Sequence, residues 1–452
     1  MKNTTNMTTG SPLRLLLSFA LPLMFGNIFQ QLYTVVDTAI VGQGVGMTAL
    51  AALGTVDWLN WMFLGIAQGF TQGFCVRIAQ KYGQQDEEGL KQTLAGSMVV
   101  SILLAVVGTA IAQLFLPQFL VLLKVPLKLK PMASLYSRII LCGFPAVVFF
   151  NFCSSCLRAV GDSKTPLYAM IAAALTNIAL DYITVFLLDW GIAGAAAATA
   201  FSQILSGFIC ARKIAKTPQL RFNKSHIRPG CKHIPQLLKM GCPIAGKNII
   251  IAAGGMYVQS VANGFDMSFI AGFTATNKLY GLLEIAAISY SYAVTTFVGQ
   301  NYGAGQTDRI KKGIKSAVLL SICTALVISG LMFLFGKNIV GLFISKEVAH
   351  LAEAAGNTAY RYLCTMSIML PVLYLLYTYQ AALHGIGNAS ASVKSGLIEL
   401  VFRITLSTIV AYTGFQEGLF IAEVSSWLSA AVYLGLQYTH DIRKISKKGV
   451  HL

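Results

Sequence analysis

The amino-acid sequence predicts an all-α integral membrane protein with twelve transmembrane helices, built as two parallel six-helix repeats. Three observations support this fold class. Of the 452 residues, 55% are hydrophobic and only 11% are charged, whereas an ordinary soluble domain has about 25% charged residues. Several apolar stretches are as long as a membrane span, and the second half of the chain repeats landmarks of the first half.

Long apolar stretches divide the chain into twelve expected spans. Stretches such as 97–123 and 317–335 are almost uncharged and approach or exceed the roughly 20 residues that a helix needs to cross a bilayer. Gly, Pro and polar residues separate the stretches. In the first half the expected helices lie near 13–42, 48–80, 91–118, 131–158, 166–188 and 192–214. In the second half they lie near 236–264, 269–302, 310–335, 355–384, 391–413 and 418–440.

Basic residues gather in the segments between these spans. The net charge of +17 would by itself also suit a nucleic-acid-binding protein. If both termini lie in the cytoplasm, however, 24 of the 34 Lys and Arg residues fall on the inner side. The residues on the outer side are Lys124, Lys128, Lys130, Lys337 and Lys346. The positive-inside rule therefore predicts a multi-pass protein of the bacterial plasma membrane with both termini cytoplasmic, and no nucleic-acid partner.

The two ends of the first half set the expected domain limits. The N-terminal apolar stretch has no small-residue cleavage site and exceeds signal-peptide length, so we expect a retained first span. The basic segment RKIAKTPQLRFNKSHIRPGCKHIPQLLK (212–239) lies near the middle of the chain. We therefore expect an N-terminal six-helix bundle (1–215), a basic cytoplasmic linker (216–235) and a C-terminal six-helix bundle (236–452).

An internal repeat supports the division into halves. The segment AQKYGQQDEEGLKQ near position 80 superposes on GQNYGAGQTDRIKK near position 300. At a shift of 220 residues the matched pairs are Gln80/Gln300, Tyr82/Tyr302 and Gly83/Gly303. At shifts of 221 to 226 they are Pro22/Pro243, Asn27/Asn248, Pro145/Pro371, Leu157/Leu383, Gly161/Gly387 and Asp162/Asn388. Because each repeat has six helices, the repeats are parallel, a plan that transporters use with the substrate path between them.

Carboxylates within spans are the main candidates for function, because a charged group at the bilayer centre costs roughly 2.5 to 3.5 kcal/mol. Asp37 lies deep in the first span with no basic residue within one helical turn. Asp181 lies in the fifth span, four residues after Asn177, so these two share a helix face. If the three groups converge, a carboxyl group there could carry a proton reversibly or ligate Na⁺. Alternatively, neighbouring hydroxyls or amides satisfy each acid, which then only fixes packing.

The second half offers a different set of polar groups. Lys247 in the seventh span and Glu284 in the eighth could form a second-half polar site, or an ion pair that lowers the cost of burying both. Asp37 corresponds by the repeat to Val258, so we expect ion coupling mainly in the first half. Glu399 and Glu423 lie in the last two spans, and the sequence does not indicate a role for either of them.

The remaining patterns in the sequence indicate helix geometry and packing more than a functional site. Pro22 removes a backbone hydrogen bond from the first span, so we expect either a functional helix bend or a plain kink there. The nine cysteines lie mostly in apolar spans and indicate packing, not a disulfide framework. Cys153 and Cys156 have no nearby His partners, and no other pattern indicates a resident metal or a catalytic group.

Five segments together resemble the multidrug and toxic compound extrusion (MATE) family of transporters, in particular its bacterial DinF-like branch. They are LPLMFGNIFQQLYTVVDTAIVG, LRAVGDSKTPL, TNIALDYI, GIAGAAAATAFSQ and VGQNYGAG. The resemblance covers nearly the whole chain and implies a V-shaped transporter. It implies ion coupling at Asp37, Asn177, Asp181 and Thr199, and a helix bend at Pro22. The chain departs from the NorM-like pattern, because it has no carboxylate in the seventh span or in the middle of the tenth.

These observations lead to one functional hypothesis and three alternatives. We expect a monomeric, ion-coupled antiporter that exports cationic or amphipathic small molecules by alternating access, with H⁺ favoured over Na⁺ and no cofactor. One alternative is a flippase for lipid-linked saccharides, which would favour a large basic cavity. Another is an intramembrane enzyme, for which the sequence offers no nucleophile pair or metal cluster. The third is a channel, which the unequal acids of the two halves disfavour.

Overall fold

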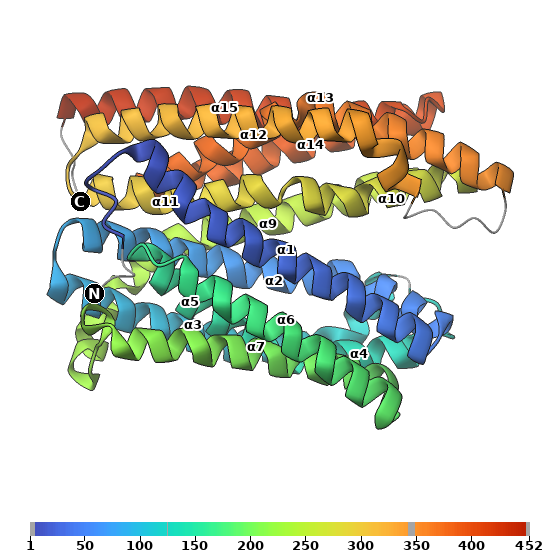
Figure 1. Ribbon diagram of the computed structural model, residues 1–452, viewed down its shortest axis with the longest axis horizontal. Coiled ribbons are helices and arrows are strands. Elements are labelled where there is room, and N and C mark those ends of the chain that lie inside the picture. Colours follow the sequence, from blue (N-terminus) through green and yellow to red (C-terminus); the bar gives the residue numbers. More distant parts are fainter. Residues whose placement is uncertain (1–4, 124, 342–348, 449–452) are drawn as a thin grey trace. The chain divides into compact units, whose positions relative to one another are not determined.

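Helices form all the regular structure in the described part of the chain. The computed structural model describes residues 5–123, 125–341 and 349–448, and Figure 1 shows its helices. Ten helical segments of this part are long and apolar enough to cross a membrane. The helices α2 (Met47–Gly83) and α9 (Ile234–Ala262) are not among those ten. At about 1.5 Å per residue, both are nevertheless long enough to cross the roughly 30 Å hydrocarbon core.

Contacts divide the chain into two compact units. Unit 1 contains the residues up to Thr9 and Leu21–Asn248, and unit 2 contains Gly10–Ala20 and the residues from Ile249 onward. The helices α1 (Pro12–Gly44) and α9 therefore contribute to both units. The domain limits predicted from sequence follow the repeat and the charge pattern, and they stay a prediction.

Unit 1 is built from the helices of the first half. After α1 and α2 come α3 (Glu87–Leu122), α4 (Lys130–Cys142), α5 (Phe144–Ala159), α6 (Lys164–Tyr182) and α7 (Gly191–Lys216). The π-helical turn η1 (Ile183–Leu187) continues α6. The basic segment after α7 forms the short turns η2 (Pro218–Leu220), η3 (Lys224–His226), α8 (Ile227–Gly230) and η4 (Cys231–His233). These turns pack against α3, and α7 packs between α5 and α6.

Unit 2 has α13 at its centre. Its helices after α9 are α10 (Met267–Leu283), α11 (Ile285–Gly303), α12 (Thr307–Gly341), α13 (Ala349–Gly385), α14 (Ser390–Thr413) and α15 (Gly418–Lys448). The helix α13 packs against α10, α11, α12 and α15, and α14 packs against α15. Most ends of the predicted spans lie within a few residues of these helix ends.

Two prolines related by the repeat have different effects on the backbone. Pro145 stands in the first turn of α5, directly after the break between α4 and α5 at Gly143. Pro371 lies inside the continuous helix α13. The position of Gly143 is occupied by Met369 in the second half. Met favours a helix far more than Gly does, so α13 continues through Pro371 without a break.

Matching turns show that the repeat is structural. Gln85 and Gly305 both have a positive φ, of 59° and 70°, at the same shift of 220 residues. Gly161 and Gly387 have φ of 88° and 92°. In the loop of Gly161, the Asp162 amide donates to the Leu157 carbonyl, as the Asn388 amide donates to Leu383. A left-handed residue thus stands at both positions in each half, and three of these four residues are glycines, which adopt a positive φ at little cost.

Small residues let α2 approach the first part of α9 closely within unit 1. A Cβ added to Gly69 would lie 2.5 Å from the Ala245 backbone, and one added to Gly73 would lie 2.6 Å from the Gly241 amide nitrogen. One turn further, the Asn248 side-chain amide donates to the Gly65 carbonyl at 2.8 Å. Such spacing of small residues is typical of helix pairs that associate in membranes through close van der Waals contact.

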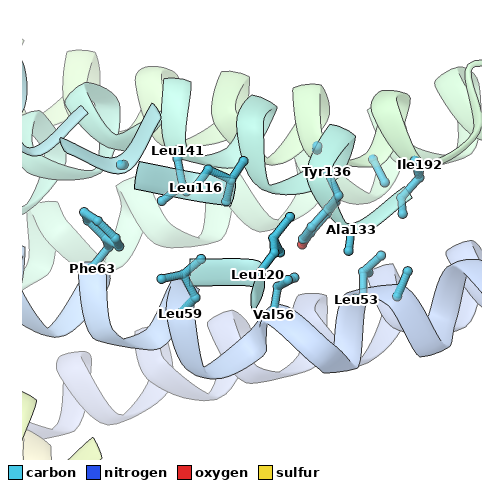
Figure 2. Close-up of a cluster of buried hydrophobic side chains, with 14 of the residues drawn as sticks. Leu53, Val56, Leu59, Phe63, Leu116, Leu120, Ala133, Tyr136, Leu141 and Ile192 are labelled. Carbon is cyan, nitrogen blue, oxygen red and sulfur yellow. The ribbon is translucent and has the colours of Figure 1, made fainter. Parts of the chain in front are cut away.

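An apolar cluster holds α1, α2, α3, α4 and α7 of unit 1 together. Figure 2 shows side chains of this cluster, which include Leu59, Phe63, Leu116 and Leu120. The Phe63 ring makes an edge contact with Phe144, with centroids 5.6 Å apart. Tyr136 of α4 belongs to the same cluster, so the packing of these helices fixes where its ring lies.

The α2–α9 packing predicts that Gly73→Ala destabilises the protein. The added methyl group would meet backbone atoms that cannot rotate away, which typically costs about 1 to 3 kcal/mol. The matched control is Gly54→Ala on the same helix, where an added Cβ meets nothing within 4 Å. Thermal unfolding of the purified variants in detergent should show a lower midpoint for Gly73→Ala only. An unchanged midpoint for Gly73→Ala would show that this contact is looser than described.

Candidate functional site

Two buried acids from different helices meet inside unit 1. Asp37 of α1 is 9% exposed, and Asp181 of α6 is fully buried. Their carboxyl groups are within hydrogen-bonding reach of each other. Two ionised carboxylates cannot donate to each other, so such a contact becomes favourable only when one of them carries a proton or a cation lies between them.

Asn177 lies one turn before Asp181 on α6 and is 1% exposed. Its side-chain amide lies beside the Asp181 carboxyl but is directed to the hydroxyl of Thr199 in α7, at 3.3 Å. Neither Asp181 oxygen receives a well-formed hydrogen bond from the described residues. The structure thus brings together all four predicted coupling residues.

No described basic residue forms an ion pair with Asp37 or Asp181. An ion pair would have fixed the acids in their ionised state. Without it, a proton or a small cation is what remains to neutralise a carboxylate in this apolar interior. The described residues contain no group of three or more His, Cys, Asp or Glu side chains that could hold a metal ion.

Four further side chains surround the acids. Tyr33 lies one turn before Asp37 on α1, close to both acids, and interacts with Gln203 of α7. Tyr136 of α4 lies near both acids, and Asp57 of α2 lies near Asp37 and Tyr136. The site therefore combines side chains of α1, α2, α4, α6 and α7.

These four residues were not predicted from the sequence, for different reasons. Asp57 is a carboxylate in the apolar segment TVDWLNWMF, so the rarity of charges in spans marks it as a candidate. Tyr33, Tyr136 and Gln203 carry no such signal. The chain has 18 tyrosines, and nothing in the local sequence distinguishes Tyr33 and Tyr136 from the others.

A change of helix type follows Asp181 directly. The α-helix ends at Tyr182 and continues as the π-helical turn η1. Beside this turn, α7 carries Gly194, where an added Cβ would lie 2.7 Å from Thr184. Single π-helical turns occur frequently at functional sites, and here the turn shifts the helix register next to a buried acid.

Pro22 lies inside α1, in the part of that helix where contacts change from unit 2 to unit 1. Fifteen residues separate it from Asp37, which is about 22 Å along a helix. The proline is therefore about four turns away from the acids. A bend at Pro22 would move Asp37 as part of a rigid helix, not by direct contact.

The predicted second-half residues fall into different units. Lys247 is buried in α9 within unit 1, and Glu284 joins α10 to α11 within unit 2. The hydroxyl of Tyr377 donates to Glu284 at 3.0 Å. A Lys247–Glu284 pair stays a prediction. Arg403 of α14 ion-pairs with Glu423 of α15 at 2.5 Å and lies 4.0 Å from Glu399.

A family model described as MatE matches the chain twice, over residues 22–183 and 243–409. The two matches begin at Pro22 and Pro243, the proline pair of the internal repeat. Among curated proteins, the chain is 28% identical to the Probable multidrug resistance protein YpnP of Bacillus subtilis, over 96% of each chain. It is 27% identical to the Probable multidrug resistance protein YoeA of the same organism, over 73% of each.

A solved structure of a MOP superfamily transporter from Pyrococcus furiosus has the same fold. It superposes on 99% of this chain and 100% of its own with a TM-score of 0.92, at 23% identity. The sequence-based expectation of an all-α transporter fold is confirmed.

The Asn177–Thr199 contact predicts a modest loss of stability in Thr199→Val. The change keeps the shape of the side chain but removes the acceptor of a buried amide, which should cost about 1 kcal/mol. Thr199→Ser keeps a hydroxyl and is the matched control. Thermal unfolding should separate the two variants, and equal midpoints would mean that the contact contributes nothing.

Proposed function

Because this chain belongs to the MATE family of transporters, we propose that it exports cationic or amphipathic small molecules across the plasma membrane in exchange for protons. The observation that carries this proposal is the contact of Asp37 with Asp181 in unit 1, where no described basic residue pairs with either acid. A carboxyl pair of this kind can gain one proton and lose it again. Membership of a transporter family also means that the chain is not an enzyme.

The exchange follows from competition for the same negative charge. When the pair faces the outside, one carboxylate oxygen accepts a proton from water, and the pair, which then carries one negative charge fewer, attracts a cationic substrate less strongly. When the pair faces the cytoplasm, the proton returns to water and the restored charge favours binding of the next cation. Because the couplings of two ligands are reciprocal, each proton bound weakens substrate binding as much as the substrate weakens proton binding.

Protons are favoured over Na⁺ by the geometry of the acids. The two carboxyl groups are close enough to share one hydrogen bond, which a single proton supplies. Pro22 supplies a bending point through which α1 could change the access of the acids.

The coupling proposal predicts the behaviour of Asp37→Asn. Asparagine keeps the size of the side chain but cannot carry a proton. In inverted membrane vesicles, a pH gradient should drive ethidium accumulation by the wild type, and Asp37→Asn should fall to the level of vesicles that lack the protein. Asp189→Asn, an exposed acid after η1 in the same unit, should transport as the wild type does.

Separate gradients distinguish the driving ions in the same assay. A sodium gradient at equal pH on both sides of the membrane should not change the accumulation of ethidium in the vesicles. Transport driven by sodium alone, or unimpaired proton-driven transport by Asp37→Asn, would overturn the proposal. Loss of transport in Asp189→Asn as well would show that the assay reports folding, not coupling.

We further propose that both termini lie in the cytoplasm, as the basic residues around the segment 216–235 suggest. Cys231 in this segment is exposed. A membrane-impermeant maleimide should therefore label Cys231 in inverted vesicles and not in intact cells. Comparison with Cys231→Ser identifies the labelled site, and labelling of Cys231 in intact cells would contradict the orientation.

A further inference from the structure

The exposed face of α7 changes from apolar to basic along the helix. Three of its apolar side chains are largely exposed, which are Phe201 (53%), Ile204 (40%) and Phe208 (62%). Arg212 and Ala215 are also exposed and continue the same face, because spacings of three and four residues place side chains in one stripe along a helix. Since α7 is long and apolar enough to cross a membrane, the apolar part of this stripe faces lipid.

The length of the apolar stripe matches one leaflet of a bilayer. Eleven residues separate Phe201 from Arg212, which is about 16 Å along a helix. Half of the hydrocarbon core measures about 15 Å. When the apolar stripe lies along the acyl chains of one leaflet, Arg212 therefore lies at the level of the lipid headgroups.

Two further basic side chains gather around the same end of α7. Lys216 follows Arg212 by one turn and is exposed. Arg221 stands directly after the turn η2, and its Nε–H donates to the Ala215 carbonyl at 2.5 Å. Ala215 lies three residues after Arg212 and directly before Lys216. The three basic side chains therefore surround one end of the helix.

The contact made by Arg221 also favours an anion at this place. The last carbonyl groups of a helix carry a partial negative charge, which repels anions. The Arg221 Nε–H covers the carbonyl of Ala215, and the Thr217 hydroxyl donates to the carbonyl of Lys213 at 2.9 Å. The terminal nitrogens of Arg221 have no partner among the described residues, so they can donate to a ligand.

The three basic side chains give this end of α7 a net positive charge. In the described part of the chain, Arg212, Lys216 and Arg221 form no ion pair with an acid. Charge complementarity therefore favours an anionic occupant. An anionic phospholipid matches both parts of the surface, because its phosphate suits the basic end and its acyl chains suit the apolar stripe. Inorganic phosphate matches the basic end alone.

We propose that this end of α7 binds an anionic phospholipid of the surrounding leaflet. The lipid phosphate accepts hydrogen bonds from Arg212, Lys216 and Arg221, and one acyl chain lies along the apolar stripe. Each basic side chain near the headgroups strengthens such binding by about fivefold. Neither Asp37 nor Asp181 takes part, so this inference and the proposed ion exchange can fail separately.

Native mass spectrometry of the purified protein in detergent tests the site by counting bound lipids. Arg212→Gln/Lys216→Gln should bind the first added molecule of dioleoyl phosphatidylglycerol roughly 10- to 30-fold more weakly than the wild type. Arg221 stays in place in this variant, because its contact with Ala215 holds the turn after α7.

The matched control is Arg228→Gln/Lys232→Gln. It removes the same two charges from exposed positions of the basic segment that follows, away from the stripe of α7, and should bind the lipid as the wild type does. Equal weakening in both double variants would indicate a general attraction to a basic surface and would overturn the proposal, as would unchanged binding in Arg212→Gln/Lys216→Gln.

Competition distinguishes the lipid from its parts and from another protein chain. Phosphatidylcholine lacks a net negative charge and inorganic phosphate lacks acyl chains, so neither should displace phosphatidylglycerol at equal concentration. Displacement by inorganic phosphate would reduce the site to one for small anions and contradict the proposal. A wild-type mass of two chains without lipid, which becomes a single chain in Arg212→Gln/Lys216→Gln, would instead assign this face to a second copy and overturn it.

Discussion

The proposed function depends on the placement of two carboxyl groups beside each other in the interior of a membrane-embedded unit. Asp37 and Asp181 are buried and close together, and neither forms an ion pair with a basic residue in the described part of the chain. Such an arrangement is unfavourable while both acids are ionised, and one bound proton relieves it. The pair can therefore exist with or without this proton, as a transporter driven by a proton gradient requires.

The packing of unit 1 keeps this arrangement in place. The apolar cluster around Phe63 and Leu120 orients α4 and hence Tyr136, the Asn177–Thr199 contact joins α6 to α7, and small residues hold α2 against α9. In a membrane, where apolar burial adds little to helix association, such contacts supply the stability that offsets the buried acids. Unit 2 handles its acids differently, because Arg403 neutralises one of them.

Most of the fold was predictable because bilayer thickness sets the length of each apolar stretch, and Gly, Pro and charged residues mark its ends. The acids Asp37 and Asp181 were predictable because charges in spans are rare. Thr199 came only from the family resemblance. Tyr33 and Tyr136 were not predictable, since their role arises from contacts between helices. The pairing of Arg403 with Glu423 joins residues 20 positions apart on two helices, and the division of α1 and α9 between the units likewise depends on tertiary contacts.

The most direct test of the account is whether substrate binding and proton binding oppose each other. Ethidium should be added to the purified protein in a weakly buffered solution while a pH-sensitive dye records protons. The account predicts that binding of ethidium releases protons and that the release disappears at a pH low enough to prevent ethidium binding. Saturable ethidium binding without proton release would contradict it.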